Sequence, residues 1–200
     1  AVFSHNMTEY FKNKVVIVTG GTNGIGKALV DLLLSKGAKV ATCGRHHDKL
    51  YGLQSEYPSY PLHTVVADVS NENDCRHFIE STIKIFGSID ILINNAGISM
   101  RALMKDISMD VLHRGFTTSN IRNVALDKDG KSQGESPMDE SSLMSAQECA
   151  RYILRAIEKK KRTLVLTFTG KRTVFMNKFF PGLADKLVRK FFFKDGKLIK

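Results

Sequence analysis

The chain has 200 residues, of which 42% are hydrophobic and 25% charged, the balance of an ordinary globular protein. This length predicts one domain with ample material for a core, and the absence of any run of about 18 uncharged apolar residues argues against a membrane-spanning helix. Cys43, Cys75 and Cys149 are odd in number and far apart. They argue against a disulfide framework and a zinc site, and they indicate a reducing, cytoplasmic environment.

The net charge of +10 is unevenly distributed along the chain. Residues 151–200 contain 15 Lys or Arg and 3 acidic residues, whereas residues 1–150 contain 15 and 17. The basic character therefore belongs to the C-terminal region and not to the whole protein. Because no nucleic-acid-binding motif accompanies this charge, we expect no nucleic-acid partner.

The first hundred residues alternate between predicted strands and helices. Continuous β-branched runs predict strands buried on both faces, and apolar residues at three-four spacing predict the helices between them. In chain order the elements are strand 14–19, helix 24–36, strand 39–43, helix 46–56, strand 62–67, helix 73–86 and strand 89–93. This order predicts a parallel sheet with right-handed crossovers, and hence an α/β, Rossmann-like doubly wound fold.

The alternation ends after Asn95. Residues 109–114 resemble the first turn of a helix, and residues 115–143 resemble a polar surface loop. An apolar stripe that begins with a capping box predicts a helix over 145–160, and a β-branched run predicts a fifth strand over 163–168.

The last segment, residues 174–193, carries apolar residues at helical spacing with Lys and Arg opposite them. Pro181 is expected to divide this helix into two pieces. We therefore predict a single dinucleotide-binding domain over residues 1–170 and a basic amphipathic extension over residues 171–200.

A glycine-rich turn follows the first predicted strand. Gly20, Gly24 and Gly26 stand between that strand and the next helix. A tight turn requires glycine, phosphates require close approach of the backbone, and a helix N-terminus offers them free N–H groups. The alternative is that these glycines serve the turn alone. The strand before them and the helix after them favour nucleotide binding.

Four motifs together resemble the short-chain dehydrogenase/reductase family. TGGTNGIG at 19–26 is similar to its TGxxxGIG motif, and NNAG at 94–97 is similar to its second hallmark. Asp68 and Val69, after the third strand, resemble its adenine-contacting pair. GFTTSN at 115–120 resembles its PGxxxT segment beside the nicotinamide.

The resemblance covers roughly residues 8–180 and is closest to the hydroxysteroid-dehydrogenase-like branch, whose substrates are small apolar carbonyls and alcohols. It also implies homo-oligomerisation. Asn94 is expected to tie neighbouring strands together. The implied cofactor-binding residues are Gly20, Thr22, Asn23, Gly24, Ile25 and Gly26 at the pyrophosphate and adjacent ribose, Asp68 and Val69 at the adenine, Asn95, Ala96 and Gly97 along the cofactor, and Thr117 and Ser119 near the nicotinamide carboxamide and the phosphates.

The end of the second strand bears on the choice of cofactor. An acidic residue there would bond both ribose hydroxyls and repel a 2′-phosphate. This chain has no acid at that place and has Arg45, which can pair with a phosphate through two hydrogen bonds. The alternative is a solvated surface arginine. The sequence favours NADP(H) over NAD(H).

The resemblance also implies a catalytic serine, and a tyrosine followed four residues later by a lysine. Such a lysine lies on the same helical face and lowers the pKa of the phenol, which near 10 is otherwise too high for an efficient base. Only Tyr10, with Lys14, satisfies this spacing, and the pair precedes the first strand, at the end of the sheet away from the glycine turn. No residue of this chain is therefore predicted to be catalytic.

The family pattern is interrupted between Arg114 and Gly115. Two βα units of the family, roughly 60 residues by the usual size of such units, have no counterpart there. The sheet is thus predicted to be shortened by the loss of two central units, with strand order 3-2-1-4 followed by the strand at 163–168.

Three interpretations follow. The first is an NADP(H)-dependent reductase whose shortened chain keeps cofactor binding but not turnover. The second is a non-catalytic nucleotide-binding protein whose basic tail docks on a membrane surface or an acidic partner. The third is that the natural molecule contains a segment between Arg114 and Gly115 that this sequence lacks. The tail's apolar stripe has its own alternatives, since it could pack on its own domain, on another subunit, or on a membrane at which the protein would be peripheral.

Overall fold

The computed structural model describes residues 7–97, 144–166, 168–183, 185–186, 193–194 and 197–198. The chain divides into two compact units, residues 1–158 and residues 159–200, called here the N-terminal and the C-terminal unit. The predicted domain boundary after residue 170 stays a prediction.

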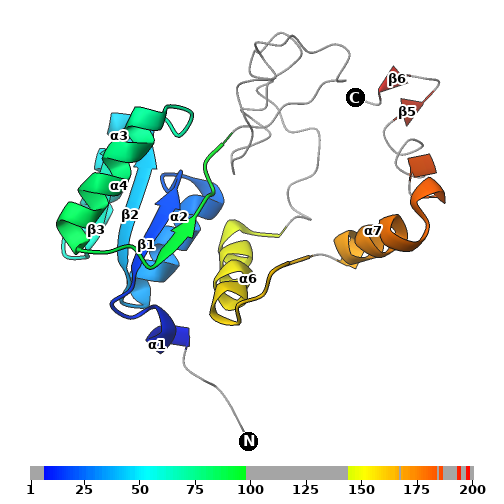
Figure 1. Cartoon of the computed structure of the whole chain (residues 1–200), viewed down its shortest axis with the longest axis horizontal. Coiled ribbons are helices and arrows are strands. Elements are labelled where there is room, and N and C mark those ends of the chain that lie inside the picture. The colour runs from blue at the N-terminus through cyan, green and yellow to red at the C-terminus, as the bar shows by residue number, and fades with distance from the viewer. Residues whose placement is uncertain are drawn as a thin grey trace, which may run out of the picture. The chain divides into compact units, whose positions relative to one another are not determined.

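The N-terminal unit is built on a four-stranded parallel sheet (Figure 1). Its strand order is β3-β2-β1-β4. The strands are β1 (Val15–Thr19), β2 (Lys39–Gly44), β3 (Leu62–Val66) and β4 (Ile91–Ile93). This sheet, with helices between successive strands, confirms the predicted Rossmann-like α/β fold.

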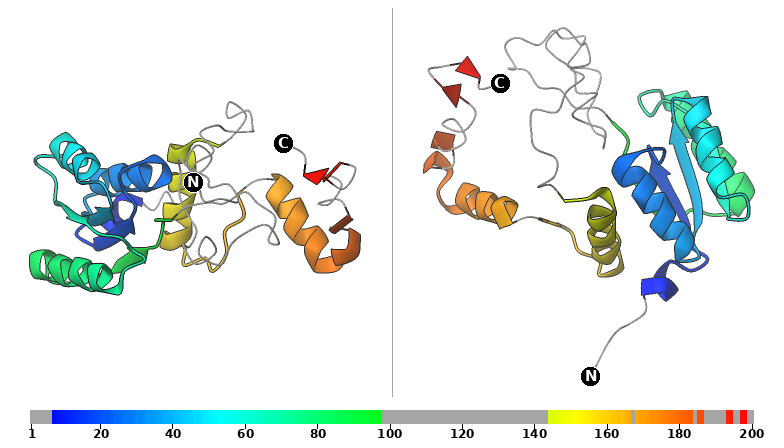
Figure 2. Two further views of the ribbon diagram at one scale, coloured as in Figure 1. Left: turned by 90° about the horizontal axis from the view of Figure 1, so that it is seen from above. Right: turned by 180° about the vertical axis from the view of Figure 1, so that it is seen from behind.

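Helices cover the two faces of the sheet unequally (Figure 2). Of the helices in the described residues that pack on the sheet, three lie on one face and one lies on the other. The first face carries α2 (Gly24–Ser35), α3 (His47–Glu56) and α6 (Ala146–Glu158), the second carries α4 (Glu72–Phe86), and the short α1 (Met7–Phe11) precedes β1.

The core reflects this layering, because alternate residues of a strand point to opposite faces. Val16 and Val18 of β1 join the cluster that also holds α2 and Leu154 of α6. Ile17, between them, joins a second cluster with Phe78 of α4. All five residues of β1 are buried, as the continuous apolar run of this strand predicts.

The helix ends follow local chemistry. Asn71 caps α4, and its side-chain oxygen accepts hydrogen bonds from the N–H groups of Asn73 and Asp74. Gly87 ends the same helix with φ = 86°, a left-handed conformation that glycine adopts without steric cost. The predicted stop at this glycine is therefore confirmed.

The predicted fifth strand is wrong. Residues 163–166 form no strand, and the described part of the sheet ends at β4. Strand propensity measures how well a side chain fits a pleated surface with neighbours, so a β-branched run with no partner strand has nothing to favour the extended ladder. Leu164 is correspondingly exposed.

The C-terminal unit contains α7 (Phe168–Phe179) and a short antiparallel pair, β5 (Phe193–Lys194) and β6 (Lys197–Leu198). The helix predicted from residue 174 therefore begins six residues earlier, and the helix expected up to residue 193 gives way to a strand there. Helix α7 ends at Phe179, two residues before Pro181. A proline disfavours helical conformation in the residue that precedes it, which here is Phe180. None of the helices in the described ranges is both long and apolar enough to cross a bilayer.

Candidate functional site

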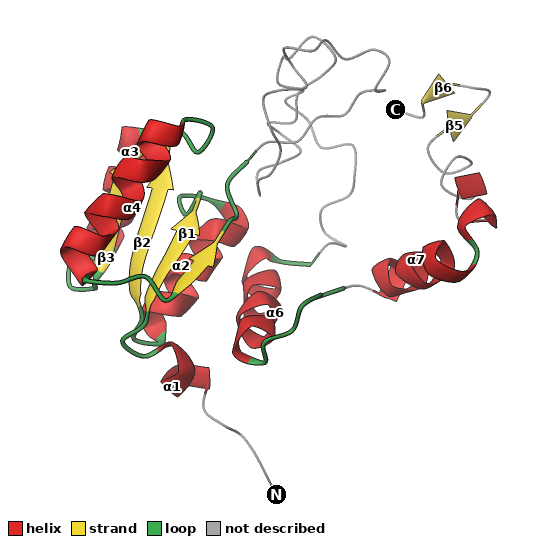
Figure 3. Cartoon of the chain, viewed as in Figure 1, coloured by secondary structure: helices red, strands yellow, loops and turns green. Residues whose placement is uncertain are grey.

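The predicted site residues of the N-terminal unit gather at one edge of the sheet. The four parallel strands end at this edge. The loops that follow them (green in Figure 3), together with the first residues of α2, carry the glycine turn 20–26, Arg45, the pair Asp68 and Val69, and residues 95–97. Ligands of open α/β sheets bind outside the carboxyl ends of the strands. Thr117 and Ser119 lie outside the described residues.

Two glycines of the turn are required by close packing. Gly20 has φ = 72°, and a Cβ atom on it would lie 3.0 Å from the Cα of Ala96. A Cβ on Gly26 would meet the carbonyl oxygen of Gly20 and lie 2.5 Å from Nδ2 of Asn95. The start of α2, the end of β1 and the segment after β4 thus lie too close together to leave room for a side chain at either glycine.

The N-terminus of α2 offers free donors beside this turn. Asn23 caps the helix, and its side-chain oxygen accepts the N–H of Gly24 at 2.7 Å. The N–H groups of Ile25 and Gly26 have no acceptor among the described residues, and the first turn contains no acidic residue. Free N–H groups with the positive end of a helix dipole suit an anion, so the turn fits the phosphates of a nucleotide.

Asn95 ties the end of β4 to the end of β1. Its side-chain amide donates to the carbonyl oxygens of Thr19 at 3.0 Å and Gly20 at 3.3 Å. The hydroxyl oxygen of Thr19 accepts the backbone N–H groups of Asn95 and Ala96. The strand-tying role that the sequence suggested for Asn94 is therefore performed by Asn95, whose side chain holds the loop in place.

Thr42 is a residue of the site that the sequence analysis missed. Its side chain is fully buried, and its hydroxyl donates to the carbonyl of Val18 at 2.6 Å and accepts the N–H of Gly21 at 3.0 Å. The hydroxyl thereby fixes the second residue of the glycine turn. A threonine inside an otherwise apolar strand is the signal that was available, because a buried hydroxyl requires a partner.

Replacing Thr42 by valine should lower the free energy of unfolding by about 1–3 kcal/mol, since the N–H of Gly21 would be left without a partner. Cofactor affinity should fall as well, because the turn would lose its anchor. Thr42→Ser keeps the hydroxyl and should therefore retain most of the stability and most of the cofactor affinity of the wild type. Urea unfolding and calorimetric titration measure the two effects, and equal affinities of the valine and serine variants would contradict this role.

Asp68 is held in place by its own loop. Its carboxylate accepts hydrogen bonds from the backbone N–H of Ser70 at 2.9 Å and from the Ser70 hydroxyl at 2.8 Å. These bonds, and then the positive charge of Arg45, lower the pKa of Asp68. Arg45 is exposed and close enough to Asp68 for its positive charge to favour the ionised carboxylate. The ends of β2 and β3 therefore contribute to one polar surface.

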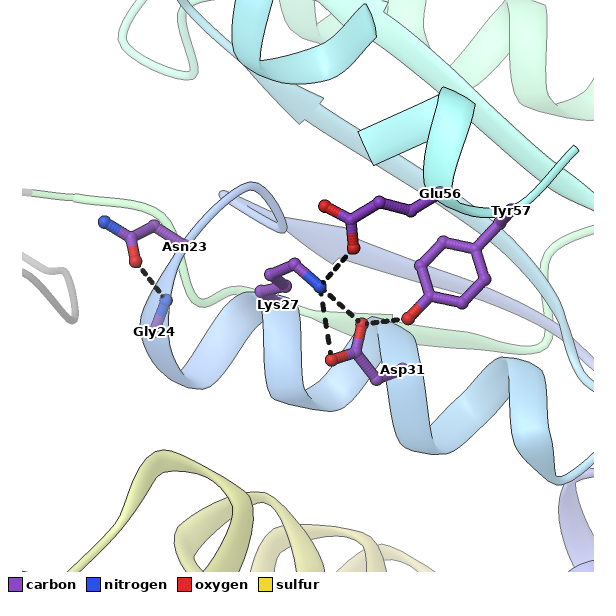
Figure 4. Close-up of polar contacts among 6 residues, drawn as sticks. All are labelled: Asn23, Gly24, Lys27, Asp31, Glu56 and Tyr57. Carbon is purple, nitrogen blue, oxygen red and sulfur yellow. Dashed lines mark hydrogen bonds and ion pairs between the residues drawn. The ribbon is translucent and has the colours of Figure 1, made fainter. Parts of the chain in front are cut away.

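Lys27, one turn into α2, is engaged away from the phosphate-binding turn (Figure 4). Its ammonium lies 2.8 Å from Glu56 and 3.3 Å from Asp31, and the hydroxyl of Tyr57 donates to Asp31 at 2.7 Å. Burial lowers the pKa of Lys27, but the bonds to Glu56 and Asp31 outweigh it and the pKa is raised. This cluster joins α2 to the end of α3.

Stability should decrease at high pH through Tyr57. Burial and the hydrogen bond to Asp31 raise the pKa of Tyr57 to about 12, above its ordinary value of 10. The contribution is therefore fully present below pH 10 and is lost as the pH rises toward 12. Urea unfolding across this range should show a smaller decrease for Tyr57→Phe than for the wild type. Tyr51→Phe, at an exposed tyrosine, is the matched control and should follow the wild type.

Tyr10 and Lys14, which have the spacing of the family's catalytic pair, lie at the other end of β1. The five residues of β1 separate Lys14 from Gly20, about 20 Å at the usual rise of a strand. The ammonium of Lys14 lies 5.0 Å from the centre of the Tyr10 ring, and that ring packs edge-on against buried Phe11. The pair therefore lies at the end of β1 away from the glycine turn, as predicted.

These features define a nucleotide-binding α/β protein of the Rossmann type. The family model described as short chain dehydrogenase matches residues 14–124, more than half of the chain. The chain thus belongs to the short-chain dehydrogenase family, as its motifs predicted.

Among similar proteins, dehydrogenase/reductase SDR family member 7B of Bos taurus is 35% identical over 61% of this chain and 40% of its own length. The 11-beta-hydroxysteroid dehydrogenase-like 2 protein of Arabidopsis thaliana is 36% identical over 52% of this chain and 35% of its own. A solved structure of Caenorhabditis elegans glucose dehydrogenase is 38% identical over 44% of this chain and 39% of its own, with a TM-score of 0.42. The chain thus spans less than half the length of these relatives.

Proposed function

We propose that this chain binds NADP(H) in preference to NAD(H) at the carboxyl edge of its sheet. The observation that carries this proposal is the pair of free N–H groups on Ile25 and Gly26 beside a turn that excludes side chains. The preference for NADP(H) rests on Arg45, exposed at the end of β2 with no acidic residue in the strand.

We further propose that the longer protein of which this sequence preserves the cofactor half interconverts a small apolar carbonyl and alcohol. The bound nicotinamide would supply or accept the hydride. The chain's own residues would hold the phosphates at the turn, and Asn95 would keep the turn in place. Since Tyr10 and Lys14 lie at the far end of β1, this chain would keep cofactor binding without turnover.

Calorimetric titration of both cofactors into Arg45→Asp tests the preference. Hydrogen bonds to a charged group contribute about 1.5–3 kcal/mol, so NADP(H) affinity should fall roughly 10- to 150-fold, while NAD(H) affinity stays or rises. Lys49→Asp makes the same charge change on the exposed surface of α3 and should leave the ratio unchanged. Unchanged relative affinities in Arg45→Asp would refute the preference, and no binding of either cofactor by the wild type would refute the site.

A second function is favoured by a separate observation, the exposed aromatic side chains of the basic C-terminal unit. We propose that this unit makes a peripheral contact with a membrane surface. Positive charge and exposed aromatic side chains coincide in the described residues of this unit.

A further inference from the structure

Helix α7 presents aromatic side chains to solvent along one side. Phe168 is 80% exposed, Phe175 57% and Phe179 56%. At about 100° per residue these three positions lie within about 40° of one another around the helix axis. The rings of Phe175 and Phe179 are 4.8 Å apart. Among the described residues, the buried core includes none from the C-terminal unit, so this unit has no core of its own that holds these rings.

Cations border this aromatic stripe. By the same helical spacing, Arg172 lies on one side of the stripe, and Lys171 and Lys178 lie on the other. All three are exposed, and the ammonium of Lys178 is 5.5 Å from the centre of the Phe179 ring. No described carboxylate forms an ion pair with any of them.

This placement decides what kind of surface α7 fits. A helix that packs on a protein core keeps its cations on the side away from the apolar stripe, because an unpaired charge is costly to bury. Here the cations would enter any contact that the rings make. An anionic bilayer surface accommodates the rings and the cations together. Aromatic rings reach the acyl boundary, while Lys and Arg side chains extend to the lipid phosphates.

We propose that α7 is an interfacial helix that lies flat on an anionic phospholipid surface. Phe168, Phe175 and Phe179 enter the lipid, and Lys171, Arg172 and Lys178 contact phosphate groups. This inference rests on the membrane contact proposed above and assigns it to one face of one helix. It is independent of cofactor binding.

The chain contains no tryptophan, so a single introduced tryptophan reports on one position. In the full chain, Phe175→Trp should shift its emission to the blue on addition of vesicles that contain phosphatidylserine, and it should be quenched by brominated acyl chains. Asn177→Trp places the same probe on an exposed position of the opposite side of α7 and should do neither. Equal responses from the two positions would contradict the assigned face.

Vesicle co-sedimentation measures the contribution of the two kinds of side chain. The triple variant Lys171→Gln, Arg172→Gln, Lys178→Gln should bind phosphatidylserine vesicles roughly 100-fold more weakly, because each cation near an anionic surface contributes about fivefold. The triple variant Phe168→Ser, Phe175→Ser, Phe179→Ser should lose binding as well. Wild-type binding should weaken in high salt and be absent with neutral phosphatidylcholine vesicles.

The outcomes distinguish the membrane contact of the C-terminal unit from the assignment of that contact to α7. If the wild type does not sediment with anionic vesicles, the membrane contact and the role of α7 are both refuted. If the wild type sediments and both triple variants sediment equally well, the contact stands but α7 does not make it. A wild-type dimer that the phenylalanine variant converts to a monomer, without lipid binding by either, would assign the stripe to a second copy and overturn the inference. Unchanged NADP(H) affinity in every variant is expected, since none of the substituted residues is a predicted cofactor-binding residue.

Discussion

Gly26→Ala should eliminate cofactor binding and lower the free energy of unfolding by about 3 kcal/mol or more. The added methyl group would meet the carbonyl oxygen of Gly20 and would lie 2.5 Å from Nδ2 of Asn95. Neither atom is the end of a flexible side chain that moves aside freely, because Asn95 is held by hydrogen bonds to the end of β1. Overpacking of this kind costs about 1–3 kcal/mol, and here it would also break the bonds of Asn95.

Gly52→Ala is the matched control for this prediction. Gly52 lies inside α3, and a Cβ on it would meet nothing within 4 Å. Alanine has a higher helix propensity than glycine, so this variant should have a free energy of unfolding about 1 kcal/mol higher than the wild type. It should keep its affinity for the cofactor. Urea unfolding and calorimetric titration test both variants. A Gly26→Ala protein with wild-type affinity would show that the turn does not approach the cofactor.

Leu154→Ala should lower the free energy of unfolding by about 2–5 kcal/mol. The side chain of Leu154 is fully buried in the cluster that α6 shares with α2, and its truncation would leave a cavity there. The prediction tests whether α6 is part of the N-terminal unit in solution. Urea unfolding monitored by circular dichroism gives the value.

Tyr152→Ala is the control on the same helix. Tyr152 is 38% exposed and lies outside the buried cluster, so its removal should lower the free energy of unfolding clearly less than that of Leu154. If Leu154→Ala were as mild as Tyr152→Ala, the packing of α6 on α2 would be refuted.

The elements up to residue 93 could be predicted from the sequence because local signals agree with one another there. The run before Gly20 is apolar throughout, the helix after it has a matching stripe, and Gly87 provides a stop. Consistency between pattern, caps and turns makes such predictions secure. The predicted positions of the glycine turn and of residues 95–97 at one edge of the sheet follow from the parallel topology.

The errors arose where a local pattern depends on a distant partner. The run at 163–168 has the composition of a strand, but a strand also needs an edge with which to pair. The start of α7 was placed six residues late because its first turns lack apolar spacing. Thr42 was missed because its two hydrogen bonds, to Val18 and Gly21, join strands that only the fold brings together.

The docking of α6 onto α2 closes a connection of about 50 residues between the end of β4 and the start of α6. The entropic cost of closing a connection increases only with the logarithm of its length. A chain with roughly 60 more residues in this interval would incur only about 0.7 kcal/mol more. The contact between α2 and α6 is therefore nearly indifferent to how much sequence lies between them, and long and short members of a family could share it.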